Sequence, residues 1–214
     1  MLEIISYKNI ESTHLYLINA IKERDLSAPI AIVADTQSAG IGSRNNEWRG
    51  LEGNLFLSFC IDRKSLPSDL PVSSMSIYFA FVLKEFLSSL GSKVWIKWPN
   101  DFYIDEKKIG GVITKLMGEN IICSIGLNLK NSPENFGKLD IRINKFYLLS
   151  NYFLKLKNSF FWKEIFIKYQ VEFSKSRSCS YYDSALKRRV SLEDAVLVED
   201  GSIMIENRRV YSLR

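Results

Sequence analysis

The segment at positions 97–101, Lys-Trp-Pro-Asn-Asp, places a cation beside two residues that can bind a nucleotide or a metal. Apolar residues precede Lys97, so we expect a strand to deliver its ammonium group to a site that binds carboxylate and phosphoryl oxygens. Pro99 fixes its own φ and restricts Trp98, which makes the turn stiff. Asn100 and Asp101 offer nucleotide contacts or a magnesium ligand. Taken alone, the segment is explained more simply as a tight turn with a solvated lysine.

The segment 37–48, Gln-Ser-Ala-Gly-Ile-Gly-Ser-Arg-Asn-Asn-Glu-Trp, is the second candidate for chemistry. Two glycines allow the backbone to approach a ligand, and exposed N–H groups can surround an anion. Arg44 adds a bidentate partner for phosphate or carboxylate. The segment is neither a dinucleotide fingerprint nor a P-loop, because it lacks the third glycine and the terminal Gly-Lys-Ser/Thr.

Glycines also interrupt two segments that are otherwise typical of strands, Lys108-Ile-Gly-Gly-Val112 and Ser124-Ile-Gly-Leu-Asn128. Glycine weakens a strand unless something must approach its backbone, so these positions indicate either ligand packing or a bulge. The amide of Asn128 suits recognition of a base or ribose, although the signal is weak alone.

Composition limits the number of domains and the kinds of site that the chain can form. The chain has 214 residues, three widely spaced cysteines without a CxxC pair, one histidine and a formal charge of +5. This predicts one good-sized domain, or one with an appendage, and neither a zinc site nor a disulfide framework. The start lacks the pattern of a signal peptide, and no apolar run approaches bilayer length, so we expect a cytoplasmic protein without a membrane partner.

Periodicity and turn residues predict the elements that position these segments. Helices are expected over 12–25, 72–90 and 147–175, the last broken near 158–159. Strands are expected over 30–35, 54–61, 94–98, 102–104, 109–116 and 120–129, with irregular stretches over 36–53 and 131–145, and short strands from about 187.

The sum predicts an α+β fold: a mostly antiparallel sheet with helices packed on one face, and a small C-terminal β unit. The predicted division places one domain over 1–182 and a small β domain over 183–214. The latter is too small to be stable alone, so it should pack on the main body.

The order and spacing of KWPND, KKIGGV and IGLN resemble the catalytic domain of biotin–protein ligases. Ser12-Thr13 and the GIGSR loop also lie where that family has its biotin-contacting and adenylate-binding segments. The motifs cover roughly residues 10–130, and the C-terminal β unit resembles a reduced form of the family's SH3-like end domain. A DNA-binding repressor function is not expected, since no helix-turn-helix pattern precedes the motifs.

The resemblance implies a role for each matching residue. Lys97 and Arg44 would be catalytic, Lys97 by neutralising the biotin carboxylate and the α-phosphate and Arg44 by holding the adenylate. Lys108 would pack by the biotin tail together with two glycines. The full implied sets are Ser12, Thr13, Ser38, Gly40, Lys97, Gly110 and Gly111 for biotin, Gly42, Arg44, Trp48, Asn100, Asp101 and Asn128 for the nucleotide, and Asp101 for Mg²⁺.

The implied reaction joins biotin to ATP, with Mg²⁺, and then transfers biotin from biotinyl-5′-AMP to a lysine of an acceptor. The expected acceptor is the biotin carboxyl carrier protein of acetyl-CoA carboxylase, and the expected assembly is a monomer or a homodimer. The family's loop is usually richer in arginine than residues 36–53 are here, which leaves the retention of the adenylate open.

Three alternatives remain compatible with the sequence. A lipoate– or octanoate–protein ligase would share the architecture and the acyl chemistry. A basic nucleic-acid-binding module would suit the pI of about 9.0, although no RNA- or DNA-binding motif is present. A biotin-binding protein without catalysis is the third, and the presence of both Lys97 and Arg44 speaks against it.

Overall fold

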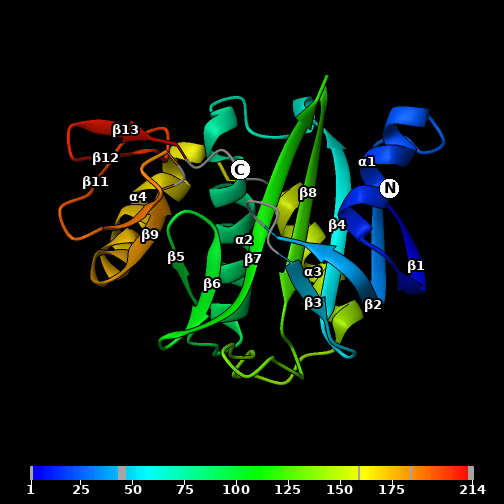
Figure 1. The fold of residues 1–214 in the computed structure, drawn as a ribbon. Helices are drawn as coiled ribbons and strands as arrows, with labels where there is room; N and C mark the ends of the chain where they lie inside the picture. Colours follow the sequence, from blue (N-terminus) through cyan, green and yellow to red (C-terminus); the bar gives the residue numbers. More distant parts are fainter. Residues whose placement is uncertain (1, 43–46, 159, 184, 212–214) are drawn as a thin grey trace.

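The computed structural model describes residues 2–42, 47–158, 160–183 and 185–211. Its elements follow the chain in an order in which strands and helices are interspersed (Figure 1). They are β1 (Glu3–Ile10), α1 (Thr13–Glu23), β2 (Ile30–Ile41), β3 (Glu47–Gly50), β4 (Leu55–Asp62), α2 (Met75–Ser89), β5 (Trp95–Lys97), β6 (Asp101–Ile104), β7 (Lys107–Met117), β8 (Asn120–Leu127), α3 (Lys145–Lys157), α4 (Trp162–Phe173), β9 (Ser180–Asp183), β10 (Arg188–Ser191), β11 (Val196–Leu197), β12 (Ile203–Ile205) and β13 (Arg208–Val210), with short 3-10 helices at Arg63–Ser65, Val72–Ser74 and Ser174–Ser178.

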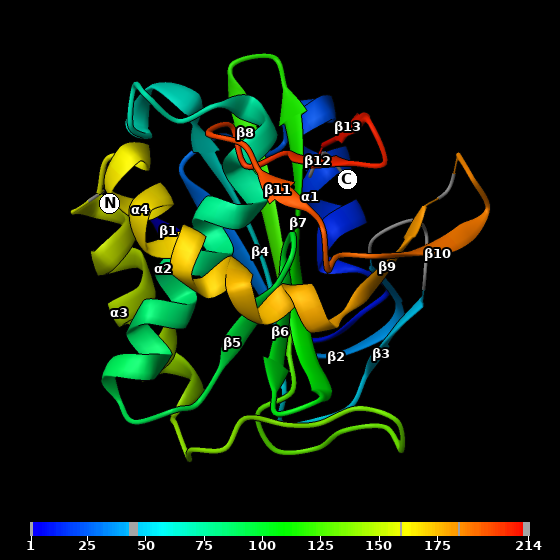
Figure 2. The same cartoon turned by 90° about the vertical axis from the view of Figure 1, so that its left-hand side faces the viewer.

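One large sheet has the strand order β1-β2-β4-β8-β7-β6-β5, with β3 paired to β2. Every pairing in it is antiparallel except β1 with β2. Helices α2, α3 and α4 lie on one side of this sheet (Figure 2). The α+β class and the mostly antiparallel sheet predicted from the sequence are confirmed.

Helix α1 is the exception to the prediction that helices cover one face. Alternating residues of β2 enter two different cores: Ala31 and Val33 join the main one, whereas Ile30 and Ile32 pack with Leu17 of α1. Since successive side chains of a strand point to opposite faces, α1 covers part of the face opposite the other helices.

The stretch 36–53, expected to be irregular, contains strand structure. β2 runs on to Ile41, and its end pairs with β3 through Gly40 opposite Trp48. A side chain on Gly40 would collide with the Trp48 carbonyl, so glycine is required for this pairing. The prediction failed because Gly and Ser are typical of loops by composition, whereas here Gly40 allows the two strand backbones to approach closely.

The C-terminal segment is attached to the main body through the turn 199–201. The indole of Trp98 donates to the Gly201 carbonyl (2.9 Å), that of Trp162 to the Glu199 carbonyl (2.7 Å), and the Ser73 hydroxyl to the Asp200 carbonyl (3.1 Å). Ile203 and Ile205 join the main core. The small β strands are therefore anchored to three parts of the main body: the turn after β5, the start of α4 and the 3-10 helix before α2. None of the described helices is long and apolar enough to cross a membrane.

Candidate active site

Strand register places four candidate residues in one row across the sheet. Lys97 of β5 lies opposite Asp101 of β6, Asp101 opposite Gly111 of β7, and Gly111 opposite Gly126 of β8. Directly opposed residues of antiparallel strands point to the same face. The row therefore presents two charged side chains next to two positions without side chains, which leaves space above the sheet.

A cavity occupies that space. It encloses about 480 Å³ between protein atoms, part of it open to solvent. Segments far apart in the sequence line it: Ser12, Thr13, His14, Gln37, Ile41, Gly42, Trp48, Leu57, Asn100, Asp101, Lys108, Gly111, Val112, Ile113, Ser124, Ile125 and Gly126.

The indole of Trp48 forms one wall of the cavity. A β-carbon on Gly126 would lie 2.7 Å from two atoms of this indole, so the ring packs directly on the glycine. Trp48 also contacts Phe136 edge to face, with ring centroids 6.0 Å apart. A second hollow, lined by Glu47, Trp48, Asn128 and residues 133–136, lies on the other side. Trp48 thus separates two neighbouring spaces.

A chain of hydrogen bonds closes one end of the cavity. The Thr13 hydroxyl donates to Gln37 Oε1 (3.0 Å) and accepts from Ser58 (2.9 Å). Ser58 Oγ lies 2.8 Å from Ser124 Oγ, which lies 2.8 Å from His14 Nδ1. This end of the cavity is rich in neutral donors and acceptors rather than charge.

His14 is uncharged at neutral pH. Burial, with a smaller contribution from the positive charge of Lys115, lowers the pKa of its imidazole to about 4. The residue follows the Ser12 N-cap of α1, so the helix start itself places it beside the cavity.

Two buried polar atoms of the cavity lining have no hydrogen-bond partner among the described residues. They are the donor Nε1 of Trp48 and the acceptor Oδ1 of Asn100. The other end of the Asn100 amide donates to the Val112 carbonyl, which fixes its orientation. An unpaired buried polar atom costs about 1–3 kcal/mol, so a ligand that pairs with it recovers this free energy.

The row of residues across the sheet is charged at the end formed by Asp101 and Lys97. Lys108 Nζ lies 2.8 Å from Asp101 Oδ1. Lys97 Nζ lies 5.5 Å from the centroid of the Tyr103 ring and does not line the cavity. Burial is the main cause that lowers the pKa of the half-buried Lys97 ammonium, with Arg189 and Lys108 adding to it and Cys179 and Asp101 opposing it.

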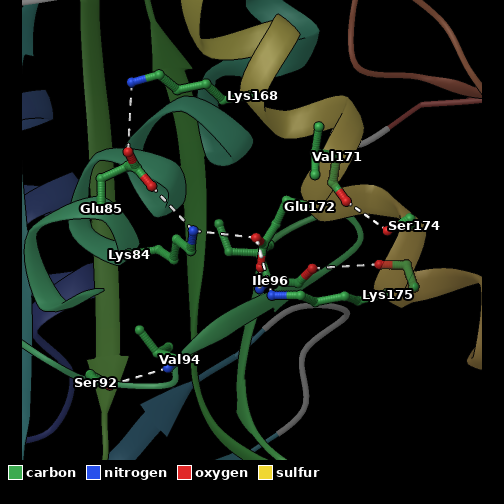
Figure 3. Close-up of polar contacts among 11 residues, drawn as sticks. Lys84, Glu85, Ser92, Val94, Ile96, Lys168, Val171, Glu172, Ser174 and Lys175 are labelled. Atoms are coloured by element: carbon green, nitrogen blue, oxygen red, sulfur yellow. Dashed lines mark hydrogen bonds and ion pairs between the residues drawn. The ribbon is translucent and has the colours of Figure 1, made fainter. Parts of the chain in front are cut away.

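The backbone of β5 is held on its outer edge by side chains from α4 and the 3-10 turn that follows it. The Ile96 N–H donates to the Glu172 carboxylate (3.0 Å), and the Trp98 N–H donates to the Ser176 hydroxyl (2.9 Å). Figure 3 shows the Glu172 carboxylate between Ile96 and Lys84, whose Nζ is 3.3 Å away. These bonds flank Lys97 on both sides and fix the direction from which it leaves the strand.

The predicted residues do not all meet in the cavity. Ser12, Thr13, Gly42, Trp48, Asn100, Asp101 and Gly111 line it. Ser38 lies at a separate surface hollow, and Gly40 serves the β2–β3 pairing. A side chain on Gly110 would meet Leu127 and the Gly126 carbonyl, so this glycine permits strand packing. The Asn128 amide bonds to Asn54 and to the Gly137 carbonyl beside the second hollow. Arg44 lies outside the described residues.

The sequence predicted no role for four members of the site: His14, Gln37, Ser58 and Ser124, although Gln37 and Ser124 begin two of the candidate segments. Their contacts join positions up to 110 residues apart, so no local spacing reveals them. For Ser58 the sequence offered one signal, since it is a polar residue within the apolar strand 54–61.

The comparisons with known proteins agree with this geometry. The model of the biotin/lipoate A/B protein ligase family matches residues 6–130, more than half of the chain, so the chain belongs to this family. The bifunctional ligase/repressor BirA of Escherichia coli is 34% identical over 127 residues, which cover 56% of this chain and 38% of BirA. The chain thus matches well under half the length of this relative.

A solved structure covers 99% of this chain. The biotin acetyl coenzyme A carboxylase synthetase of Helicobacter pylori, with bound biotinylated ATP, superposes with a TM-score of 0.94 at 37% identity, over 99% of this chain and 100% of that one. The biotin protein ligase of Aquifex aeolicus, in complex with biotin and ATP, has a TM-score of 0.70 at 22% identity over 99% and 96%. The second likeness bears on the fold alone.

Proposed function

We propose that this protein is an ATP-dependent biotin–protein ligase, which activates biotin as biotinyl-5′-AMP and transfers it to a lysine of an acceptor protein. The observation that carries the proposal is the cavity with two unlike ends. One end is the neutral hydroxyl–amide network around Thr13, and the other is the row that leads to Asp101 and Lys97. Biotin has the same polarity, a neutral ureido ring and an anionic carboxylate. The H. pylori protein, similar over its whole length, holds biotinylated ATP.

The first step joins two anions. A carboxylate oxygen of biotin attacks the α-phosphorus of ATP, the bond to the bridging oxygen breaks, and pyrophosphate leaves. Repulsion between the reactants must be reduced where charge develops. Lys97, held by β5, supplies a fixed positive charge for this purpose, and Arg44 is proposed as a second. In the transfer step the acceptor's amine attacks the acyl carbon, AMP leaves, and the amine loses a proton.

Trp48 and Asn100 serve the nucleotide in this proposal. The unpaired Trp48 Nε1 and Asn100 Oδ1 offer one donor and one acceptor beside the cavity. Gly42 lines the same cavity, and Asn128 lines the second hollow, which also borders Trp48. A planar base has both kinds of partner at its edge.

Mg²⁺ is part of the proposal, with Asp101 as its one protein carboxylate. The described residues include no group of three acidic, Cys or His side chains that could hold a metal by themselves. This fits a metal bound mainly by ATP oxygens, as Mg²⁺ in nucleotide sites usually is. When bound, it would neutralise phosphate charge; Asp101 would have to leave or share its contact with Lys108.

The remaining parts of the proposal concern the whole protein. The acceptor is the biotin carboxyl carrier protein of acetyl-CoA carboxylase, the assembly is a monomer or homodimer, and no DNA is bound. The cytoplasm is the proposed location, because ATP is available there. We also propose that residues 1–182 and 183–214 act as a catalytic and an appended unit.

ATP–pyrophosphate exchange with biotin, lipoate and octanoate in parallel tests the proposal. We expect exchange with biotin only, since the hydroxyl–amide end matches the ureido ring better than an apolar acyl chain. Lys97→Ala should abolish exchange while far-UV circular dichroism stays unchanged. Lys93→Ala, which removes an exposed lysine just before β5, is the matched control and should retain exchange. Exchange with lipoate or octanoate instead would change the substrate, and full activity of Lys97→Ala would refute the role of Lys97.

A further inference from the structure

The hydrogen-bond chain at the neutral end of the cavity has one member whose direction is fixed. The backbone N–H of Thr13 lies 2.8 Å from Gln37 Oε1, and a backbone N–H can only donate. The amide oxygen of Gln37 therefore faces Thr13. The Thr13 hydroxyl, 3.0 Å from the same oxygen, must also donate to it.

The directions of the next two bonds follow from proton counting, because a hydroxyl has a single proton to donate. Thr13 has used its proton, so it accepts from Ser58 (2.9 Å). Ser58 has then used its own proton, so it accepts from Ser124 (2.8 Å). Ser124 has no proton left for His14, whose Nδ1 lies 2.8 Å from its oxygen.

We infer that His14 is the terminal donor of this chain: its imidazole carries the proton on Nδ1, donates it to Ser124, and so orients three hydroxyls toward Gln37. The other neutral tautomer, with the proton on Nε2, would bring two lone pairs together at 2.8 Å. To avoid that contact, one of the three hydroxyls would have to turn its proton away and give up its hydrogen bond in the series. Nothing local in the sequence assigns this role to His14.

The orientation has a consequence for the ligand. Thr13 and Ser124 line the cavity, and each has given its proton to the chain while keeping one free lone pair. They can only accept from a bound molecule. At these two positions the cavity therefore favours a group that carries N–H donors. This part of the inference rests on the proposed function, in which that group is the ureido ring of biotin.

The tautomer can be measured without any ligand. His14 is the only histidine of the chain, so a protein made with ¹⁵N-labelled histidine and without a histidine tag gives one imidazole signal set. Long-range ¹H–¹⁵N correlation at neutral pH should show Nδ1 as the protonated nitrogen and Nε2 as the unprotonated one. Ser124→Ala, which removes the acceptor, should shift the population toward Nε2–H. A predominantly Nε2–H imidazole in the unmodified protein would overturn the inference.

Substitutions test the effect on the ligand. His14→Leu removes the terminal donor, and biotin affinity by calorimetry should fall roughly tenfold, the worth of one hydrogen bond to a buried hydroxyl. His14→Asn places an amide N–H near the position of Nδ1 and should recover most of the affinity. Tyr16→Phe, which removes an exposed hydrogen bond from the same helix, should bind biotin as the unmodified protein does.

The selectivity of the variants separates orientation from general loss of structure. Lipoate has no N–H donor in its ring, so His14→Leu should lower the preference for biotin over lipoate, whereas ATP affinity should not change. Equal affinity for biotin in His14→Leu and the unmodified protein would overturn the effect on the ligand. If the unmodified protein binds no biotin, the proposed function fails, while the tautomer measurement still decides the inference about His14.

Discussion

Replacing Glu172 by alanine should destabilise the protein strongly, because this residue is only 5% exposed. Its carboxylate lies between the edge of β5 and Lys84. The substitution removes the acceptor of the Ile96 N–H (3.0 Å) and the anion that lies 3.3 Å from Lys84. Lys84 keeps Glu85 as a second partner at 3.1 Å, so its charge is not left alone.

The expected magnitude follows from these contacts. A buried N–H without a partner costs about 1–3 kcal/mol. Removing one partner of a buried ion pair costs about 3–5 kcal/mol when the other charge is stranded, and less here because Glu85 remains. We therefore expect Glu172→Ala to lower the free energy of unfolding by about 3 kcal/mol. Glu172→Gln keeps an acceptor for the Ile96 N–H and should lose only about 1 kcal/mol.

Urea unfolding at neutral pH measures both values, and Glu164→Ala, an exposed glutamate of the same helix, is the control with an expected change within about 0.5 kcal/mol. The alanine and glutamine variants should also differ in ATP–pyrophosphate exchange, since the bond to Ile96 flanks Lys97. Equal stability of these two variants would refute the reasoning, because the hydrogen bond to β5 would then contribute nothing.

Three further changes test other contacts. Gly126→Ala should displace the Trp48 indole, which leaves no room for a β-carbon, and weaken nucleotide binding at least tenfold in a titration with an ATP analogue, whereas unchanged binding would place the nucleotide elsewhere. Because the pKa of His14 is lowered to about 4 by burial, its contribution to stability is full above the unfolded value of 6.5 and falls as pH decreases toward 4. Between pH 6.5 and 4 the free energy of unfolding of the unmodified protein should therefore fall by about 2–3 kcal/mol more than that of His14→Asn, as measured by urea unfolding at each pH. Trp98→Phe removes the bond to Gly201 and should speed limited proteolysis of the C-terminal strands; identical digestion would mean that this bond does not hold them.

Local patterns predicted the helices and most strands because each has a local cause. The Ser12 cap and three-residue spacing of apolar residues define α1, and Gly91, at φ 91°, ends the region of α2. The break expected near 158–159 separates α3 from α4. Such signals act within a few residues, so a single sequence contains them.

The sequence could not distinguish the two adjacent glycines of β7. Gly111 lines the cavity, whereas Gly110, one residue away, packs against Leu127 and the Gly126 carbonyl. A shift of one residue changes the face of the sheet, and register is set by pairing with distant strands. The same reason hid Ser58 and Gln37, whose partners are brought together only by the assembled sheet.

The side chains that accept hydrogen bonds from the edge of β5 also limit which other extended chains can pair with this sheet. An exposed edge strand offers unpaired backbone groups to any other extended chain, and proteins often protect such edges. At Ile96 and Trp98 the outward N–H groups are already bonded to Glu172 and Ser176. A foreign strand could add at this edge only by displacing an intramolecular partner from each. The contacts that aim Lys97 thereby also protect this edge from aggregation.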